Sequence, residues 1–400
     1  MKKRFNIHPI RVDSQAQARQ LMKDLGVWEE GINIMAPKAQ HFAIKAGPLS
    51  AQAAQILKQE MLSKGGEAAV HGQVIKGLSD SHVVLLGTLA QYRKLLPKLN
   101  LQDFQLPQLS KELEDVLNNL ANGSSFRTLH CRHKKLVIGS RTLVMGILNV
   151  TPDSFSDGGR YLDPQLAVDR ALEMEEQGAD IIDIGGESTR PGYEPVSSEE
   201  EITRLLPVLE KVAQKVNIPI SVDTYKASTA RAVLDRGADI INDVSGSGDT
   251  LMSSTVAEFG APFIIMHSVR EPGMDIIGEI ISTLGKKKRE ALEEGVREEN
   301  IILDPGIGFS KDTRENLEVI NRLDALKCLG SPILIGTSRK SVVGSVLDVP
   351  PRERLHGTSA TVAAAIMRGA DIVRVHDVKE MCQVARMTDA ILGMGESKNG

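Results

Sequence analysis

The 400-residue sequence has few cysteines, few aromatic residues and almost no excess of either charge. Its three widely spaced cysteines, Cys131, Cys328 and Cys382, suit neither a disulfide framework nor a zinc cluster, and they indicate a reducing, cytoplasmic environment. An aromatic content of 3% argues against a surface that stacks nucleic-acid bases. A net charge of −4 gives no general attraction to nucleic acid or to membrane surfaces.

Long apolar runs are also missing. No run approaches the length needed to span a bilayer. The polar stretch Asn6-Ile7-His8-Pro9 interrupts any apolar core of a signal peptide. A hydrophobic content of 41% and a charged content of 25% are ordinary for a soluble globular protein. We therefore expect a cytoplasmic protein with no membrane partner.

Eight short apolar runs lie between Thr142 and Val375, and each stops at residues that can bind or react. The runs are residues 142–148, 181–184, 218–222, 240–241, 262–266, 301–303, 332–335 and 372–375. The residues that follow them are Asn149, Gly185-Gly186-Glu187, Asp223, Asn242-Asp243, His267, Asp304, Thr337-Ser338 and His376. Runs without polar alternation predict strands buried on both faces. Eight of them, separated by helical stretches, predict an α/β fold with a (β/α)8 TIM barrel, whose active site lies at the carboxyl ends of the strands.

An internal repeat supports the barrel. Gly178-Ala179-Asp180 recurs as Gly237-Ala238-Asp239 and as Gly369-Ala370-Asp371, each time before an apolar run. Each copy has a glycine suited to ending a helix, followed by a short turn and a strand. A doubly wound open sheet uses the same joint, but its G-x-G-x-x-G fingerprint is missing after the first run. The barrel is therefore favoured.

The first 125 residues predict a separate small α/β domain of unknown role, and residues 126–400 predict the barrel domain. A polar stretch at residues 121–125 marks the boundary. We expect a β-α-β-β-α order, which is compatible with a ferredoxin-like module. Its strands are residues 41–46, 70–75 and 82–86, with helices from Ser50 to about Ser63 and from about Ala90. Residues 128–138, with a turn at Gly139-Ser140, predict a hairpin that plugs the bottom of the barrel.

Two carboxylates, Asp223 and Asp304, end the third and sixth predicted strands. Two anions at one barrel mouth repel each other unless a cation or a donor-rich group lies between them. The pair therefore indicates a ligand with a guanidine-like edge, or a metal. The alternative is that each aspartate caps a helix.

A cationic pocket is predicted on the last two strands. Arg374 and His376 lie two residues apart on the eighth strand and share a face. The turn Gly336-Thr337-Ser338-Arg339-Lys340 follows the seventh strand, where this fold usually binds phosphate. The alternatives are that Arg374 pairs structurally with Asp371 or Asp377, and that Lys340 is simply solvated. A charge inside an apolar strand requires an anionic partner in either case.

Two long loops suit active-site lids. Residues 151–159 follow Asn149, and residues 188–192 follow the second strand with Arg190 at the tip. No histidine and cysteine spacing suggests zinc, and no Ser-His-Asp arrangement is evident.

Long motifs in this region resemble those of dihydropteroate synthases. Residues 145–159 are similar to the first family signature and residues 183–192 to the second. Later motifs follow in the family's order: Ser221-Val222-Asp223-Thr224, residues 241–246, residues 304–309, Ser338-Arg339-Lys340-Ser341 and residues 374–378. The resemblance covers about residue 136 to the end.

The resemblance implies that 6-hydroxymethyl-7,8-dihydropterin pyrophosphate condenses with para-aminobenzoate, in the folate-synthesis step that sulfonamides inhibit. It implies Mg²⁺, with Asn149 as a ligand, and a homodimer. The implied catalytic residues are Asp223, Asp304, Lys340, Arg374 and His376. The implied pterin contacts are Asp223, Asn242, Asp304 and Lys340; the para-aminobenzoate contacts are Thr189, Arg190, Phe309 and Ser338; and the pyrophosphate contacts are Asn149, Arg374 and His376. The alternatives are a methyltetrahydrofolate–corrinoid methyltransferase and a non-catalytic pterin-binding relative.

Overall fold

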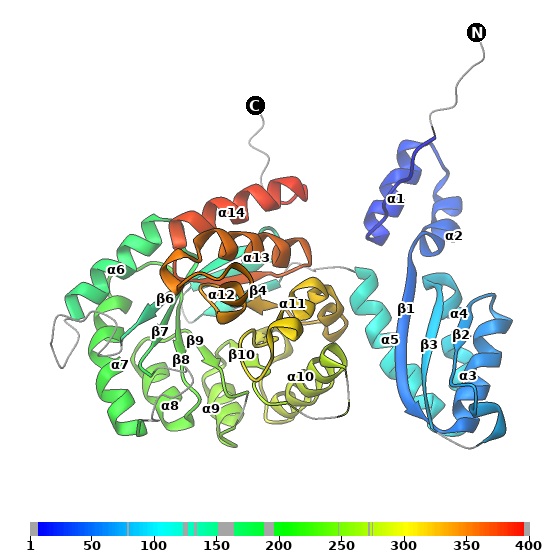
Figure 1. Cartoon of the computed structure of the whole chain (residues 1–400), viewed down its shortest axis with the longest axis horizontal. Helices are drawn as coiled ribbons and strands as arrows, with labels where there is room; N and C mark the ends of the chain where they lie inside the picture. The colour runs from blue at the N-terminus through cyan, green and yellow to red at the C-terminus, as the bar shows by residue number, and fades with distance from the viewer. Residues whose placement is uncertain are drawn as a thin grey trace, which may run out of the picture. The chain divides into compact units, whose positions relative to one another are not determined.

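The chain forms two compact units, Met1–Gly123 and Ser124–Gly400, in a computed structural model (Figure 1). The structure describes residues 7–77, 80–122, 127–131, 134–150, 164–187, 196–246, 248–270, 273 and 275–395. Both predicted lid loops, residues 151–159 and 188–192, lie outside the described residues.

The N-terminal unit is a three-stranded antiparallel sheet in the order β1-β3-β2, with helices around it. Its elements are α1 (Gln15–Asp24), α2 (Glu29–Ala39), β1 (His41–Leu49), α3 (Ala51–Ser63), β2 (Glu67–Ala69), η1 (Val74–Lys76), β3 (Ser81–Thr88), α4 (Leu89–Leu99) and α5 (Leu106–Asn122). Ser50 caps α3 by accepting a hydrogen bond from the Ala53 N–H. The order from β1 to α4 matches the predicted β-α-β-β-α module, but α5 follows where a ferredoxin-like fold continues with a strand.

The predicted strand at residues 70–75 is wrong. The strand lies earlier, at Glu67–Ala69, and Val74–Lys76 forms a single 3-10 turn that ends at Gly77 in the left-handed region (φ 70°). Val74 turns into the core of the unit while Ile75 is 78% exposed. Of the two apolar residues Val74 and Ile75, only Val74 is therefore buried, and both belong to a turn and not to a strand.

The second unit is a closed barrel of eight parallel strands with helices around it, which confirms the predicted fold (Figure 1). The strands are β6 (Leu143–Asn149), β7 (Ile181–Gly185), β8 (Ile220–Asp223), β9 (Ile240–Asp243), β10 (Phe263–Met266), β11 (Ile301–Asp304), β12 (Leu334–Ile335) and β13 (Ile372–Val375). Leu303 and Ile333 close the ring through a parallel bridge, in which the Leu303 N–H donates to the Pro332 carbonyl at 2.9 Å.

Helices alternate with these strands along the chain. They are α6 (Pro164–Glu176), α7 (Ser198–Ala213), α8 (Ala227–Arg236), α9 (Met252–Phe259), α10 (Ile276–Glu293), α11 (Thr313–Asn321), α12 (Ser341–Leu347), α13 (Leu355–Met367) and α14 (Val378–Ile391). Short 3-10 turns occur at η2 (Glu298–Asn300), η3 (Leu323–Leu329) and η4 (Pro351–Glu353). Within the described residues, no helix is both long enough and apolar enough to cross a membrane.

A hairpin of β4 (Arg127–Cys131) and β5 (Lys134–Ile138) packs against the amino ends of the barrel strands. Its buried side chains join one apolar cluster with residues from every barrel strand except β8: Leu129, Cys131, Leu136, Ile138, Leu143, Met145, Ile181, Ile240, Ile264, Ile302, Leu334 and Ile372. The hairpin is therefore the predicted bottom plug. The predicted turn at Gly139-Ser140 is not part of the hairpin, because these residues lead from β5 into β6. Since β4 and β5 pair with each other from Arg127 with Ile138 to Cys131 with Lys134, the hairpin is complete at Ile138.

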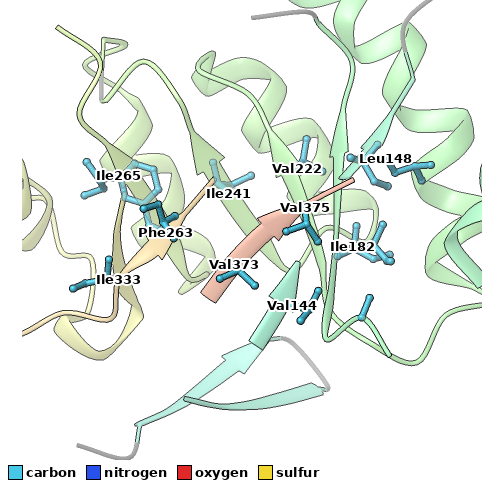
Figure 2. Close-up of a cluster of buried hydrophobic side chains, with 14 of the residues drawn as sticks. Val144, Leu148, Ile182, Val222, Ile241, Phe263, Ile265, Ile333, Val373 and Val375 are labelled. Atoms are coloured by element: carbon cyan, nitrogen blue, oxygen red, sulfur yellow. The ribbon is translucent and has the colours of Figure 1, made fainter. Parts of the chain in front are cut away.

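Alternate residues of the same strands point outward and pack under the helices, as Figure 2 shows for Val144, Ile182, Val222 and Ile241. Burial on both faces explains why the strands are continuous apolar runs. Inward residues at the amino ends are apolar, and polar ones such as Asp183, Asp223 and Asn242 begin at the middle of the strands, so the site lies toward their carboxyl ends.

The repeated Gly-Ala-Asp joint has a specific role. Gly178, Gly237 and Gly369 end helices with φ of 101°, 124° and 88°, a conformation that favours glycine. The aspartates Asp180, Asp239 and Asp371 each accept a hydrogen bond from a backbone N–H of the neighbouring strand, on Val144, Ile220 and Ile333 at 2.8–2.9 Å. The joint therefore both ends the helix and sets the register of two strands.

Candidate active site

Polar side chains meet at the carboxyl ends of the barrel strands. Register places Gly185 of β7 beside Asp223 of β8, and Asp223 beside Asn242 of β9. Asn149 ends β6 opposite Gly185. A Cβ atom on Gly185 would lie 3.6 Å from the Asn149 Oδ1 and 3.8 Å from the Asp223 Cβ. Asn149 and Asp223 therefore lie on either side of Gly185 at the mouth.

Arg374 of β13 forms two ion pairs across the barrel. Its Nε donates to the Asp183 Oδ2 at 2.6 Å and its Nη2 to the Asp223 Oδ2 at 2.9 Å. Asp183 is fully buried, and Arg374 is largely so. The alternative partners are wrong, because Asp371 accepts from the Ile333 N–H and Asp377 pairs with Arg339.

Asp183 was missed as a site residue. It is an acidic residue in the middle of an apolar strand, which is the same signal that marked Arg374 as needing a partner. Its Oδ2 also accepts from the Asn242 Nδ2 at 3.3 Å. The Asp183 Oδ1, Asn242 Oδ1 and Ser221 Oγ have no hydrogen-bond partner among the described residues. These three atoms leave polar capacity for water or a ligand inside the mouth.

The two predicted carboxylates have unusual proton affinities. Burial raises the pKa of Asp223 to about 7. The Arg374 guanidinium opposes this shift, and the negative charge of Asp183 adds to it. Burial also raises the pKa of Asp304, while the Gly306 N–H, which donates to its Oδ1 at 2.7 Å, lowers it. Neither aspartate caps a helix, because the N-cap residue of α8 is Lys226, which makes no side-chain cap, and α11 is capped by Asp312.

Lys340 stands among these charges and is not a solvated surface lysine. Its Nζ lies 4.4 Å from the centroid of the Phe309 ring. Burial and the neighbouring Arg374 lower its pKa to about 8, while Asp304 and Asp223 oppose that shift. The ammonium ion therefore lies within electrostatic reach of both carboxylates and is protonated at pH 7.

His376 lies beside Ser338, whose Oγ is 3.1 Å from the His376 Nδ1 and accepts from the His376 N–H at 3.2 Å. Burial, followed by the nearby Arg374, lowers the pKa of His376 to about 3. The imidazole is therefore neutral at pH 7, so it adds a hydrogen-bonding group and not a charge to the predicted cationic pocket. Positive charge in the mouth comes from Arg374 and Lys340, and Arg374 lies between two carboxylates, so acidic and basic groups interleave.

The predicted para-aminobenzoate contacts divide between described and undescribed parts of the chain. Phe309 and Ser338 follow β11 and β12 at the mouth, whereas Thr189 and Arg190 lie outside the described residues. Among the described residues, no group of three or more His, Cys, Asp or Glu side chains could hold a metal ion by itself.

Comparisons with known proteins identify the family of this chain. Residues 145–376 match the model of the pterin binding enzyme family. A dihydropteroate synthase from Bacillus subtilis is 50% identical over 276 residues, which cover 68% of this chain and 97% of the relative. The chain belongs to the dihydropteroate synthase family. It is an enzyme, a transferase of folate biosynthesis, so the corrinoid methyltransferase and the non-catalytic relative are both set aside.

Solved family structures share the barrel. Dihydropteroate synthase from Clostridium difficile, determined in the presence of pteroic acid, is 51% identical, with a TM-score of 0.62 over 64% of this chain and 98% of that one. The Xanthomonas albilineans family member in complex with 7,8-dihydropteroate is 35% identical, with a TM-score of 0.62 over 67% of this chain and 100% of that one.

The N-terminal unit also has a counterpart. A probable bifunctional folylpolyglutamate synthase/dihydropteroate synthase from Halobacterium salinarum is 41% identical over 387 residues, which cover 95% of this chain and 46% of the relative. The match therefore extends through most of the N-terminal unit. The Bacillus subtilis family member, in contrast, is matched over 97% of its length by only 68% of this chain.

Proposed function

We propose that the barrel mouth condenses 6-hydroxymethyl-7,8-dihydropterin pyrophosphate with para-aminobenzoate to give 7,8-dihydropteroate and pyrophosphate. The observation that carries this proposal is the meeting of Asp223, Asp304, Arg374 and Lys340 at one mouth, with the pKa values of both carboxyl groups raised. The pterin ring has a guanidine-like edge that donates hydrogen bonds. Asp223 and Asp304 accept from such an edge, and Asn242 and Lys340 meet the remaining heteroatoms.

The para-aminobenzoate subsite in this proposal uses Phe309, Ser338, Thr189 and Arg190. Phe309 offers an aromatic face and Arg190 a cation for the carboxylate. A structure of the Xanthomonas albilineans family member with 4-aminobenzoic acid supports the choice of substrate. A Yersinia pestis family member in complex with a sulfonamide drug supports inhibition of this chain by the same drug class.

Arg374, His376 and Asn149 would bind the pyrophosphate. Arg374 keeps donors beyond the two that serve Asp183 and Asp223, because a guanidinium has five. The site also fits Mg²⁺, since Asn149 supplies a hard amide oxygen at the mouth and Mg²⁺ commonly takes few protein ligands together with substrate phosphates and water. Bound there, the ion would neutralise charge on the diphosphate.

We propose a dissociative path. The bond between the pterin methylene carbon and the diphosphate oxygen breaks first, and its electron pair leaves with pyrophosphate. Asp223 and Asp304 stabilise the cation that spreads over the pterin, as preorganised groups aimed at developing charge. The aniline nitrogen then attacks the methylene carbon and loses a proton. Aryl amines are neutral at pH 7, so the step does not require a strong general base.

The reaction is tested by mixing the full chain with both substrates and Mg²⁺ and measuring dihydropteroate and pyrophosphate together. Equal amounts of the two products are expected. Binding of the pterin substrate without pyrophosphate release would refute the synthase reaction.

Three further proposals have tests of their own. Omitting Mg²⁺ and adding a chelator should reduce the rate, and light scattering tests the proposed homodimer. Cell fractionation tests the proposed cytoplasmic location.

The pH dependence of kcat/KM for the pterin substrate should be bell-shaped. Asp223 must be ionised to hold the developing cation, so activity is expected to fall as pH drops through about 7. Lys340 must be protonated to donate, so activity is expected to fall as pH rises through about 8. Lys340→Arg should move the alkaline limb upward and Asp223→Asn should flatten the acid limb. Profiles that stay unchanged in both variants would contradict these roles, once the substrate's own titration has been subtracted.

Deleting residues 1–123 is expected to leave kcat/KM within about threefold of the full chain, which is less than about 0.7 kcal/mol. The barrel has apolar cores separate from those of the N-terminal unit. Relatives such as the Bacillus subtilis synthase match over 97% of their length without that unit. The measurement is steady-state kinetics on the truncated chain. A folded but inactive barrel would show that the N-terminal unit takes part in catalysis.

A further inference from the structure

Lys311, in the connection between β11 and α11, has its ammonium ion enclosed by the protein. Its Nζ lies 2.9 Å from the His267 Nδ1 and donates to the carbonyls of Gly306 at 2.9 Å, Phe309 at 3.1 Å and His267 at 3.4 Å. An ammonium ion has three protons, so these four acceptors use all of them. No donor remains for a substrate, and Lys311 can act only through the groups that it holds.

Two of those groups, the carbonyls of Gly306 and Phe309, belong to the segment that carries Asp304, and the other two belong to His267 directly after β10. The Gly306 N–H donates to the Asp304 Oδ1 at 2.7 Å, so the Gly306 peptide fixes the carboxylate. Gly306 has a φ of 69°, and a Cβ atom there would lie 2.0 Å from the His267 carbonyl oxygen. The segment therefore packs directly against His267, the residue after β10, whose N–H donates to the Asp304 carbonyl at 2.9 Å.

A second layer of charged groups lies next to His267. Because an ammonium ion only donates, the His267 Nδ1 is the acceptor and the ring proton is on Nε2, which lies 3.5 Å from the Glu279 Oε1 without a hydrogen bond between them. Glu279 is fully buried and accepts from the Arg270 Nε at 2.9 Å, and Arg270 also pairs with Glu315. Burial lowers the pKa of Lys311 to about 8, which leaves it protonated at pH 7.

We propose that Lys311 is a positioning residue for catalysis, which holds the Asp304 carboxylate and the Phe309 ring in register with Lys340. The inference rests on the substrate roles proposed above for Asp304 and Phe309. Without the ammonium ion, the Gly306, Phe309 and His267 carbonyls lose their common donor. Residues 304–309 would then lose the contacts that stabilise their turn, and with it the orientation of the Asp304 carboxylate and of the Phe309 ring next to Lys340.

The test compares Lys311→Met with Lys288→Met. Lys288 is the matched control because it is also buried and donates from α10 to the Leu329 carbonyl and to Glu298, away from the mouth. We expect Lys311→Met to lower kcat/KM about 100-fold, the size of effect that a small misplacement of reacting groups produces. The loss should be divided between a lower kcat, through Asp304, and a higher KM for para-aminobenzoate, through Phe309. Lys288→Met should lower the melting temperature but leave both constants unchanged per folded molecule.

Lys311→Arg provides a second variant if Lys311→Met does not fold. The guanidinium keeps the charge but cannot place one nitrogen at all four contacts, so we expect a folded protein with kcat/KM reduced about tenfold. Kinetic constants within twofold of the wild type in either folded variant would overturn the proposal. Asp304→Asn, measured in parallel, separates the two failures: if that variant keeps its activity, the substrate site is wrong, whereas a large loss there with none at Lys311 rejects the positioning role alone.

Discussion

Asp304→Asn is expected to lower kcat about 10²- to 10³-fold, equivalent to about 3–4 kcal/mol of transition-state stabilisation. The amide keeps the shape and the oxygen that accepts from the Gly306 N–H, so the turn should survive. It removes the negative charge that would face the pterin cation inside a buried site, where electrostatic interactions are strong. Steady-state kinetics with both substrates and a thermal melt measure the two effects.

Asp312→Asn is the control for that prediction. Asp312 lies eight residues later and caps α11 by accepting from the Glu315 N–H at 2.8 Å, a role that asparagine also fills. It should therefore leave both kcat and the melting temperature unchanged. If Asp304→Asn barely moves kcat or KM, the assignment of Asp304 to the pterin subsite is wrong.

Arg374→Met is expected to abolish activity and to lower the free energy of unfolding by about 3–5 kcal/mol, because it leaves two buried carboxylates without their cation. Asp183 is fully buried and Asp223 nearly so. Most of the expected loss in free energy of unfolding comes from the two carboxylates left buried without a cation, and little of it from the contact area of the arginine side chain. Urea denaturation measures the stability change, and product assays measure the activity.

The loss should depend on pH in a specific direction. Burial raises the pKa of Asp223 to about 7, and Arg374 lowers it, so removing Arg374 raises it further above the ordinary value. A carboxyl group with a raised pKa binds more protons in the folded state than in the unfolded state, so stability falls as pH rises. Arg374→Met should therefore be more stable at about pH 5 than at about pH 8. Adding Asp183→Asn should recover part of the loss, and an equal loss at both pH values would contradict this explanation.

The barrel strands could be predicted from sequence because the signal is local. A strand buried on both faces must be apolar at consecutive positions, and the run must stop where the mouth becomes polar. The run at residues 301–303 and the strand Ile301–Asp304 differ by the single residue that carries the chemistry. The Gly-Ala-Asp repeat is equally local, since its glycine needs a left-handed φ whatever lies around it. At residues 70–75 the local pattern predicted a strand that is not there. The path of the chain in the folded unit decides which of these apolar side chains is buried, and the local pattern does not contain that information.

Partners in the site could not be predicted in the same way. Arg374 and Asp183 are 191 positions apart, and nothing near Arg374 separates Asp183 from Asp371 or Asp377 as its partner. The neutral state of His376 likewise depends on burial and on Arg374 inside the folded mouth. Lys311 resembles any lysine at a helix start until four acceptors converge on its Nζ.

The sequence alone therefore determined the barrel, the end at which its chemistry lies and the family to which it belongs, because apolar period, turn glycines and long motifs are properties of neighbouring residues. Only the tertiary structure decided which charges pair, which groups are protonated and which lysine holds the segment of Asp304. Those properties depend on distances and burial between strands that closure of the barrel brings together.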